Sequence, residues 1–257
     1  MSTSIPNTML LPTYHLIAPE NSEFAYSTSE SRLREQFELL NELSRVNGSP
    51  RPCVSFDDGH ASHYRHAFPI LERYRVEAIF FVVAGWAGVR CDYMTWPQLR
   101  ELAAAGYQIQ SHGLTHRFLT QCTGAELAHE LRVSKIELEQ RLGISVDAIS
   151  IPFGRWNDRV LIACSDAGYT RVYTSDPQRA PARDGRCATL GRFMVRRSTT
   201  LNELRRIVVC DDKTLLALQT RHEWKLRLRR AVGEEIYHRV WGILASRRAL
   251  HEARAEY

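Results

Sequence analysis

The chain has 257 residues, of which 44% are hydrophobic and 25% are charged, and its formal net charge is +5. These values are typical of a globular protein with a sizeable core, and no apolar run is long enough to predict a membrane-spanning helix. Six cysteines lie at wide intervals with no C-x-x-C pair, so we expect reduced thiols and no zinc knuckle or disulfide framework. The N-terminus lacks a basic segment followed by an apolar one, so we expect no secretory signal and a cytoplasmic location.

The positive charge is concentrated at the C-terminal end. Residues 213–257 contain ten Lys or Arg and five Asp or Glu, a surplus that equals the net charge of the whole chain. Residues 1–212 are therefore neutral overall. A neutral body does not predict a nucleic-acid-binding protein, because such proteins need a basic surface for the phosphate backbone.

Helices and strands alternate along residues 1–212. The first predicted helix, residues 29–48, has an apolar face and a possible capping box formed by Ser27 and Glu30. Three more helices are predicted at 95–106, 123–143 and 157–168, with N-terminal caps at Thr95, Thr123 and Asn157. Buried strands are predicted at 53–56, 78–85, 107–112, 147–154, 170–175 and 191–195. Strands that alternate with helices of this length predict an α/β fold with parallel pairing.

Polar residues follow three of these predicted strands. Asp57 and Asp58 end the strand at 53–56, His112 ends the strand at 107–112, and the segment 152–155 (PFGR) ends the strand at 147–154. In parallel α/β folds the reactive side chains gather at the carboxyl ends of the strands. We therefore expect these three clusters to meet at one end of the sheet.

The segment 112–116 (HGLTH) places His112 and His116 four residues apart. Taken alone, two such histidines are more often capping or surface residues, and an Asp-Asp-Gly sequence is more often a tight turn. Together with one aspartate they would form a site of two imidazoles and one carboxylate, which is typical of a catalytic metal centre. The other aspartate would then be free to act as a general base.

The three clusters together resemble the motifs of the polysaccharide deacetylase family, also called the NodB-homology or carbohydrate esterase 4 group. Residues 55–59 (SFDDG) are similar to its first motif, residues 112–116 to its second, and residues 152–154 (PFG) to its third. The segments 66–86 and 96–116 are also similar to the family, as is the Tyr-His pair at 14–15. The resemblance spans roughly residues 12–210.

This resemblance implies a distorted (β/α) barrel. It also implies that Asp57 is the general base and that Asp58, His112 and His116 bind a divalent metal, usually zinc, with cobalt or nickel as alternatives. The backbone N–H of Phe153 would face the developing oxyanion. The residues expected to line the substrate groove are Pro152, Gly154, Arg155, Trp156 and His60.

The sequence departs from the family in two places. Ser150 stands where the third motif usually begins with an arginine that orients the base, so Arg155 or Arg192 is expected to supply that cation, and Arg192 is our candidate catalytic residue. The late Leu-x-His motif, whose histidine protonates the leaving group, is absent. The remaining candidates for this proton donor are three other histidines, His15, His60 and His63.

We divide the chain into residues 1–50, an N-terminal strand and helix joined to the barrel; residues 51–212, the deacetylase barrel; and residues 213–257, a basic helical extension. In the extension, apolar residues recur at helical spacing in two segments, 215–228 and 236–244. These helices either pack on the barrel or form a peripheral surface for anionic membrane lipid, at the inner face of the membrane.

The expected function is metal-dependent removal of an acetyl group from an amino sugar of a glycan or glycan precursor, with no nucleic acid partner. Two alternatives remain open. The first is hydrolysis of a non-sugar C–N bond such as a cyclic amide, and the second is a carbohydrate-binding relative without activity.

Overall fold

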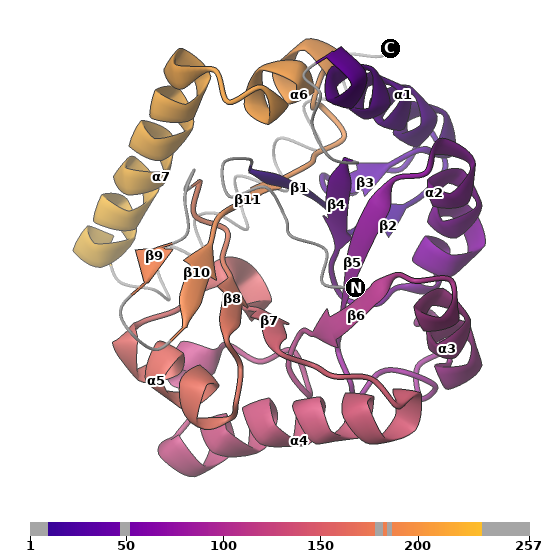
Figure 1. Ribbon diagram of the computed structural model, residues 1–257. Coiled ribbons are helices and arrows are strands. Elements are labelled where there is room, and N and C mark those ends of the chain that lie inside the picture. The colour runs from indigo at the N-terminus through magenta and orange to yellow at the C-terminus, as the bar shows by residue number, and fades with distance from the viewer. Residues whose placement is uncertain (1–9, 47–51, 178–181, 184–186, 233–257) are drawn as a thin grey trace. The chain divides into compact units, whose positions relative to one another are not determined.

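The computed structural model describes residues 10–46, 52–177, 182–183 and 187–232. The chain forms two compact units, Met1–Asp211 and Asp212–Tyr257. The first unit contains a nine-stranded sheet in the order β11-β1-β4-β5-β6-β7-β8-β10-β9, in which only the β10–β9 pair is antiparallel. The eight parallel strands curve into a nearly closed barrel inside a ring of helices (Figure 1). The expected distorted (β/α) barrel is therefore confirmed.

The strands of the barrel are short. They are β1 (Leu11–Tyr14), β4 (Cys53–Phe56), β5 (Glu77–Val82), β6 (Gln108–Ser111), β7 (Ala148–Ser150), β8 (Arg171–Tyr173), β9 (Ala182–Arg183), β10 (Ala188–Leu190) and β11 (Arg192–Met194). A separate parallel pair, β2 (Leu16–Ile17) and β3 (Ser27–Thr28), follows β1. The helices of this unit are α1 (Glu30–Val46), α2 (Phe68–Tyr74), α3 (Trp96–Ala104), α4 (Gly124–Leu142), α5 (Asp158–Asp166) and α6 (Leu201–Val208).

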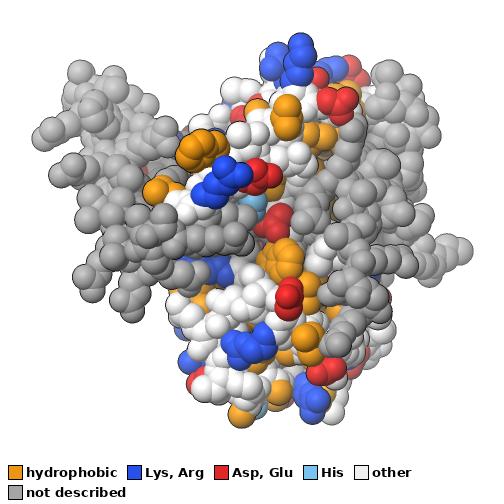
Figure 2. Space-filling view, turned by 90° about the vertical axis from the view of Figure 1, so that its left-hand side faces the viewer, with side chains coloured by type: hydrophobic (Ala, Val, Ile, Leu, Met, Phe, Trp, Pro, Cys, Tyr) orange, Lys and Arg blue, Asp and Glu red, His pale blue; other side chains and the backbone are white. Residues whose placement is uncertain are grey.

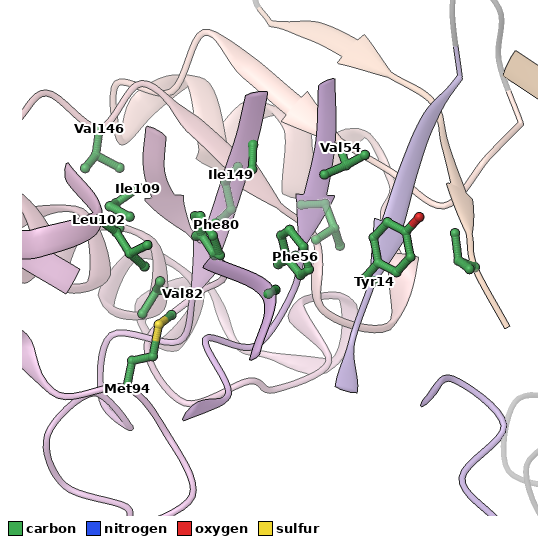
Figure 3. Close-up of a cluster of buried hydrophobic side chains, with 14 of the residues drawn as sticks. Tyr14, Val54, Phe56, Phe80, Val82, Met94, Leu102, Ile109, Val146 and Ile149 are labelled. Atoms are coloured by element: carbon green, nitrogen blue, oxygen red, sulfur yellow. The ribbon is translucent and has the colours of Figure 1, made fainter. Parts of the chain in front are cut away.

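Alternation along the strands creates two hydrophobic clusters. In β5, Phe80 and Val82 belong to the large cluster between the sheet and the helices (Figure 3), whereas Ile79 and Phe81 belong to a smaller cluster. Because successive side chains of a strand point to opposite faces, this second cluster lies inside the barrel. By the same alternation, Ser55 and Asp57 of the β4 segment point inward while Phe56 points to the helices.

Most of the predicted helix starts are confirmed. The Thr95 N–H donates to Gln98 Oε1 at 2.9 Å, and the Thr123 N–H donates to Glu126 Oε2 at 2.7 Å. At α5 the direction is reversed, because the Asn157 side chain accepts from the backbone N–H three residues later at 3.0 Å. These contacts satisfy backbone N–H groups that have no partner within the helix.

The predicted capping box of the first helix is wrong. Ser27 lies in β3, and its hydroxyl donates to the Phe24 carbonyl at 2.7 Å. The cap is Ser29 instead, whose Oγ accepts from the Arg32 N–H at 3.3 Å. Three serine or threonine residues precede this helix in sequence, and the pairing of β3 with β2 removes the earlier ones from the capping position.

Several short elements were missed. Helices α2 and α6 have only seven and eight residues, and β9 and β10 have two and three, which is too short for a clear periodicity. The predicted strand at 147–154 is β7 followed by a tight 3₁₀ turn at Pro152–Gly154. The six cysteines are free thiols. On the face in Figure 2, described acidic and basic side chains are interspersed.

The second unit is described through a single helix, α7 (Asp212–Val232). It covers the first of the two helical segments predicted in the C-terminal extension. The second predicted segment, residues 236–244, lies outside the described residues. Among the helices that the structure describes, none has the length and apolar character needed to cross a membrane.

Replacement of Phe37 by Ala is expected to lower the free energy of unfolding by about 3–5 kcal/mol, because it leaves a cavity under α1. Phe37 is 0% exposed and makes an edge-to-face contact with Tyr14 of β1, with ring centroids 6.0 Å apart. Denaturant unfolding measures the change. Glu38→Ala, at the exposed neighbouring position, is the control and should change stability by less than about 0.5 kcal/mol.

Candidate active site

A buried ion pair lies at the carboxyl end of the barrel. Arg192, the first residue of β11, donates from Nη1 to Asp57 Oδ1 at 2.6 Å and from Nη2 to Asp57 Oδ2 at 2.9 Å. Both residues are 2% exposed. Burial alone would raise the pKa of Asp57, but the charge and hydrogen bonds of Arg192, together with the nearby imidazoles, outweigh it and hold this pKa below its ordinary value. Asp57 is therefore a fixed, ionised carboxylate.

The structure settles which arginine reaches the candidate base. It is Arg192, whose Nε also donates to the Thr174 carbonyl at 3.3 Å. Arg155 is buried as well, with its guanidinium 4.5 Å from the centre of the Phe118 ring. Ser150 joins the ion pair, since its hydroxyl donates to Asp57 Oδ2 at 3.2 Å and accepts from Arg192 Nη2 at 2.7 Å. The short serine in the third motif thus leaves room for an arginine from a different strand.

The three predicted metal ligands lie together. Asp58 Oδ1 is 3.3 Å from His112 Nε2 and 3.3 Å from His116 Nε2, and all three ligand atoms lie within 4.8 Å of one another. Ligands bound at 2.0–2.1 Å to a tetrahedral ion are about 3.4 Å apart, so the spacing fits a zinc-like ion. Hydrogen bonding to the two imidazoles outweighs the effect of burial and lowers the pKa of Asp58, which therefore remains ionised.

Each imidazole is oriented by its surroundings. His112 Nδ1 lies 2.8 Å from the Ser150 carbonyl, which can only accept a hydrogen bond, so Nδ1 carries a proton and Nε2 is the nitrogen directed toward Asp58 and available to a metal. The His116 ring lies between two aromatic rings, with centroids 5.2 Å from Trp86 and 4.5 Å from Phe153. The donor set is therefore preorganised for a metal.

A buried glutamate that we did not predict fixes the loop between the two histidines. Glu130 of α4 is 3% exposed, and its Oε2 accepts from the Leu114 N–H at 3.0 Å and from the Thr115 N–H at 2.9 Å. Its other oxygen accepts from the Thr115 hydroxyl. In the sequence, Glu130 is one of several acids on a helix. The only signal that it is buried is its place among the apolar positions of that helix.

Three residues of the site adopt the left-handed backbone conformation that favours glycine: Asp58 (φ 75°), His116 (φ 60°) and Phe153 (φ 58°). Such conformations cost about 1–3 kcal/mol each and persist where the surrounding structure imposes them, often at functional sites. At Asp58 the conformation turns the chain sharply after Asp57. The two neighbouring carboxylates therefore face different partners, one Arg192 and the other the histidines.

The third motif forms one wall beside the metal ligands. Phe153 is 53% exposed and stacks on Phe118 with ring centroids 4.0 Å apart. Pro152, the residue before it, is buried. Gly154 has a φ of 64°, and a Cβ atom added to it would lie only 2.3 Å from the hydroxyl oxygen of Ser175. Only glycine fits that position.

The remaining predicted groove residues have separate partners. Trp156 donates from Nε1 to Asp176 Oδ2 at 2.9 Å. His60 accepts at Nδ1 from the Ser62 N–H at 3.1 Å, and its ring packs on Tyr93 with centroids 5.8 Å apart. The structure gives neither residue a contact with the metal ligands, so their substrate-binding role remains a prediction.

Of the three candidate proton donors, His15 lies nearest to the catalytic pair. Tyr14 of β1 is in register with Phe56 of β4, so His15 is the neighbour of Asp57 and points inward with it. The nearby charges of Asp57 and Asp58 raise the pKa of His15, but burial lowers it by more. Its Nδ1 is buried without a hydrogen-bond partner. His63 is instead bound through Nε2 to the His15 carbonyl at 2.6 Å, which leaves His15 as the candidate.

The structure is thus a parallel (β/α) barrel with two aspartates and two histidines at the carboxyl ends of its strands, three of which could hold a metal ion. Residues 47–172, which contain all three motifs, match the family profile described as polysaccharide deacetylase. This segment, about half of the chain, belongs to the polysaccharide deacetylase family.

Similar proteins cover different parts of the chain. YxkH of Bacillus subtilis, which is named for this family, is 30% identical over 51% of the chain and 47% of its own length. A chitooligosaccharide deacetylase of Sinorhizobium fredii is 29% identical over 59% of the chain and 69% of its own length. The structure of the deacetylase PplD of Streptococcus pyogenes, solved with acetate, superposes with a TM-score of 0.70 at 24% identity, covering 79% of this chain and 99% of that one. This last likeness shows the fold.

Replacement of Glu130 by Ala is expected to weaken zinc binding about 10- to 100-fold, because the loop that carries His116 loses its three anchoring hydrogen bonds. Competition with a chromogenic chelator measures the affinity. Glu137→Ala, which removes a surface ion pair with Arg141 on the same helix, is the control and should bind zinc as the unmodified protein does. Equal affinities for the two variants would contradict the role assigned to Glu130.

Proposed function

We propose that this chain is a metal-dependent deacetylase that hydrolyses the acetamide of an amino sugar in a glycan or glycan precursor. The observation that carries the proposal is the division of labour between two adjacent carboxylates: Asp57 pairs with a buried arginine, and Asp58 faces two imidazole nitrogens. Family membership and the name of the Sinorhizobium relative support this choice of substrate.

Asp58, His112 and His116 would hold the metal, and zinc suits one carboxylate and two imidazoles. A divalent ion bound there supplies Lewis-acid polarisation of the acyl oxygen and acidifies water. Asp57 accepts the proton from the attacking water, since its Oδ2 lies 3.9 Å from His112 Nε2 and so borders the metal site. Arg192 keeps this carboxylate ionised and fixes its direction.

Two other residues act on the substrate. The N–H of Phe153 donates to the oxygen that becomes negative as the acyl carbon turns tetrahedral, and the left-handed conformation of this residue sets the direction of the donor. His15, whose pKa is lowered by burial, would take up the proton that Asp57 has accepted from the water and pass it to the departing amine. His15 would thus protonate the leaving group in place of the histidine of the Leu-x-His motif, which this sequence lacks.

The alternatives differ in the shape of substrate they require. A cyclic amide would need a closed pocket, whereas Phe153 presents an exposed ring beside the metal ligands, which suits stacking of a sugar face. An inactive binding protein would not need the strained backbone at Asp58 and His116. We therefore favour the deacetylase.

Asp57→Asn is expected to retain bound zinc and to lose about 10²- to 10⁴-fold in turnover, because the amide cannot accept the proton. His116→Ala is expected to lose the zinc itself. Metal content by elemental analysis and acetate release from acetylated chitooligosaccharides measure the two effects, with circular dichroism to check folding. Near-normal turnover by a fully loaded Asp57→Asn protein would exclude Asp57 as the base. Equal metal content in both variants would exclude the site.

A second proposal concerns the C-terminal unit, which we suggest binds anionic membrane lipid. Three apolar residues of α7 are exposed at spacings of four and eight, namely Leu216 (65%), Trp224 (65%) and Leu228 (53%). This spacing places them on one stripe of the helix, and the exposed Arg227 lies beside it. Apolar side chains flanked by basic ones suit a helix that lies in the headgroup region.

The double change Trp224→Ala and Arg227→Gln is expected to reduce sedimentation with acidic vesicles, since each basic residue near the headgroups contributes about 1 kcal/mol. The binding should also weaken at high salt, because exposed charges are screened. Arg73→Gln, on α2 of the barrel, is the control. Equal sedimentation of all three proteins would mean that α7 is not a membrane surface.

A further inference from the structure

A small basic cavity lies beside the candidate active site and has no role in the chemistry described above. Its volume is about 90 Å³, which is room for several water molecules. Its walls come from the segments that follow β1 and β11, and they carry three arginines, Arg32, Arg196 and Arg197. Because these segments leave the carboxyl ends of their strands, the cavity opens at the same end of the barrel as the aspartates and histidines.

Several polar groups of the cavity lack partners. Arg32 donates from Nη2 to the Thr199 carbonyl at 3.0 Å, but its Nε is buried with no hydrogen-bond partner. Neither Arg32 nor Arg196 forms an ion pair with any residue that the structure describes. Thr28 is 4% exposed and also lines the cavity. A buried donor without a partner is costly, so these groups indicate an acceptor that is bound in use.

The other lining groups are consistent with an anion. Ser29 caps α1, so the first turn of this 17-residue helix lies at the cavity with its positive end. The single acid of the wall, Glu20, is exposed and accepts a hydrogen bond from the Ser31 hydroxyl. With three guanidinium groups against one carboxylate, the wall carries a net positive charge.

A tyrosine connects this cavity to the active site. The Tyr26 ring lies 5.3 Å from the His15 ring, centroid to centroid, and the Arg196 guanidinium lies 5.5 Å from the centre of the same Tyr26 ring. On the other side, His15 is the inward neighbour of Asp57. A ligand that extends past His15 over Tyr26 would therefore bring its next group to Arg196.

We propose that this cavity binds a phosphate group of the substrate, so that the enzyme acts on an amino sugar carried as a phosphate or diphosphate ester. The inference rests on the deacetylase function proposed above and names its substrate class. Phosphate fits better than a carboxylate because it offers three or four acceptor oxygens to the arginines, the Thr28 hydroxyl and the helix N-terminus at once. A neutral glycan would offer no negative charge to Arg32 and Arg196.

Two acetylated substrates that differ only in charge test the proposal: N-acetylglucosamine 1-phosphate and its neutral methyl glycoside. We expect the zinc-loaded full chain to have a KM at least about tenfold lower for the phosphate ester, which is the effect of charge-assisted hydrogen bonds. Arg196→Gln and Arg32→Gln should each remove this advantage and leave kcat and the KM of the neutral substrate unchanged. Arg100→Gln, which removes an equal charge on α3, is the control and should retain the advantage.

A second measurement does not depend on turnover. Titration calorimetry with inorganic phosphate should show saturable binding to the unmodified chain and a loss of at least about tenfold in affinity in Arg196→Gln. Absence of phosphate binding, or equal KM values for the two substrates, would overturn the proposal while leaving deacetylation intact. Conversely, if the protein binds phosphate but releases no acetate from either substrate, the phosphate site would stand and the proposed deacetylase function would be rejected.

Discussion

The bond between Asp57 and Arg192 is the contact on which the rest of the site depends. One guanidinium, buried inside the barrel, reaches Asp57 after β4, Ser150 of β7 and the Thr174 carbonyl after β8, while its own backbone lies in β11. Burying two charges is expensive and is repaid only when their hydrogen bonds are satisfied. Here the carboxylate has three donors, and the guanidinium donates to three different residues. The pair therefore fixes four strands relative to one another at the end where the chemistry takes place.

The position of the metal site follows from this bond. Once Asp57 is turned inward toward Arg192, Asp58 can reach the histidines only through a left-handed turn, which the structure shows at φ 75°. Gly59 continues that turn with a φ of 76° beside Val82 of β5. The three-residue sequence Asp-Asp-Gly thus forms a tight turn, and this turn directs its two carboxylates to different partners.

The sequence predicted the parts of the site that are local. Asp57, Asp58, His112, His116 and Phe153 lie in short motifs at the ends of strands, and the alternation of strands and helices predicted that these ends would meet. The supporting residues were harder to find, because their role depends on distant partners. The sequence left two candidate arginines, Arg155 and Arg192, because Arg192 is 135 residues away from Asp57 in the chain and only the barrel brings the two together. Glu130 resembled an ordinary surface acid of a helix.

The place of β1 has a consequence for how the protein is made. In the sheet, β1 lies between β4 and β11. One of the two strands that pair with it, β11, is therefore synthesised about 180 residues later. During translation, Asp57 emerges early and has no cation inside the barrel until Arg192 leaves the ribosome. Asp57 therefore acquires its buried ion pair only after the chain has been made as far as β11. Closure of the barrel by β11 is thus the step that completes the candidate site.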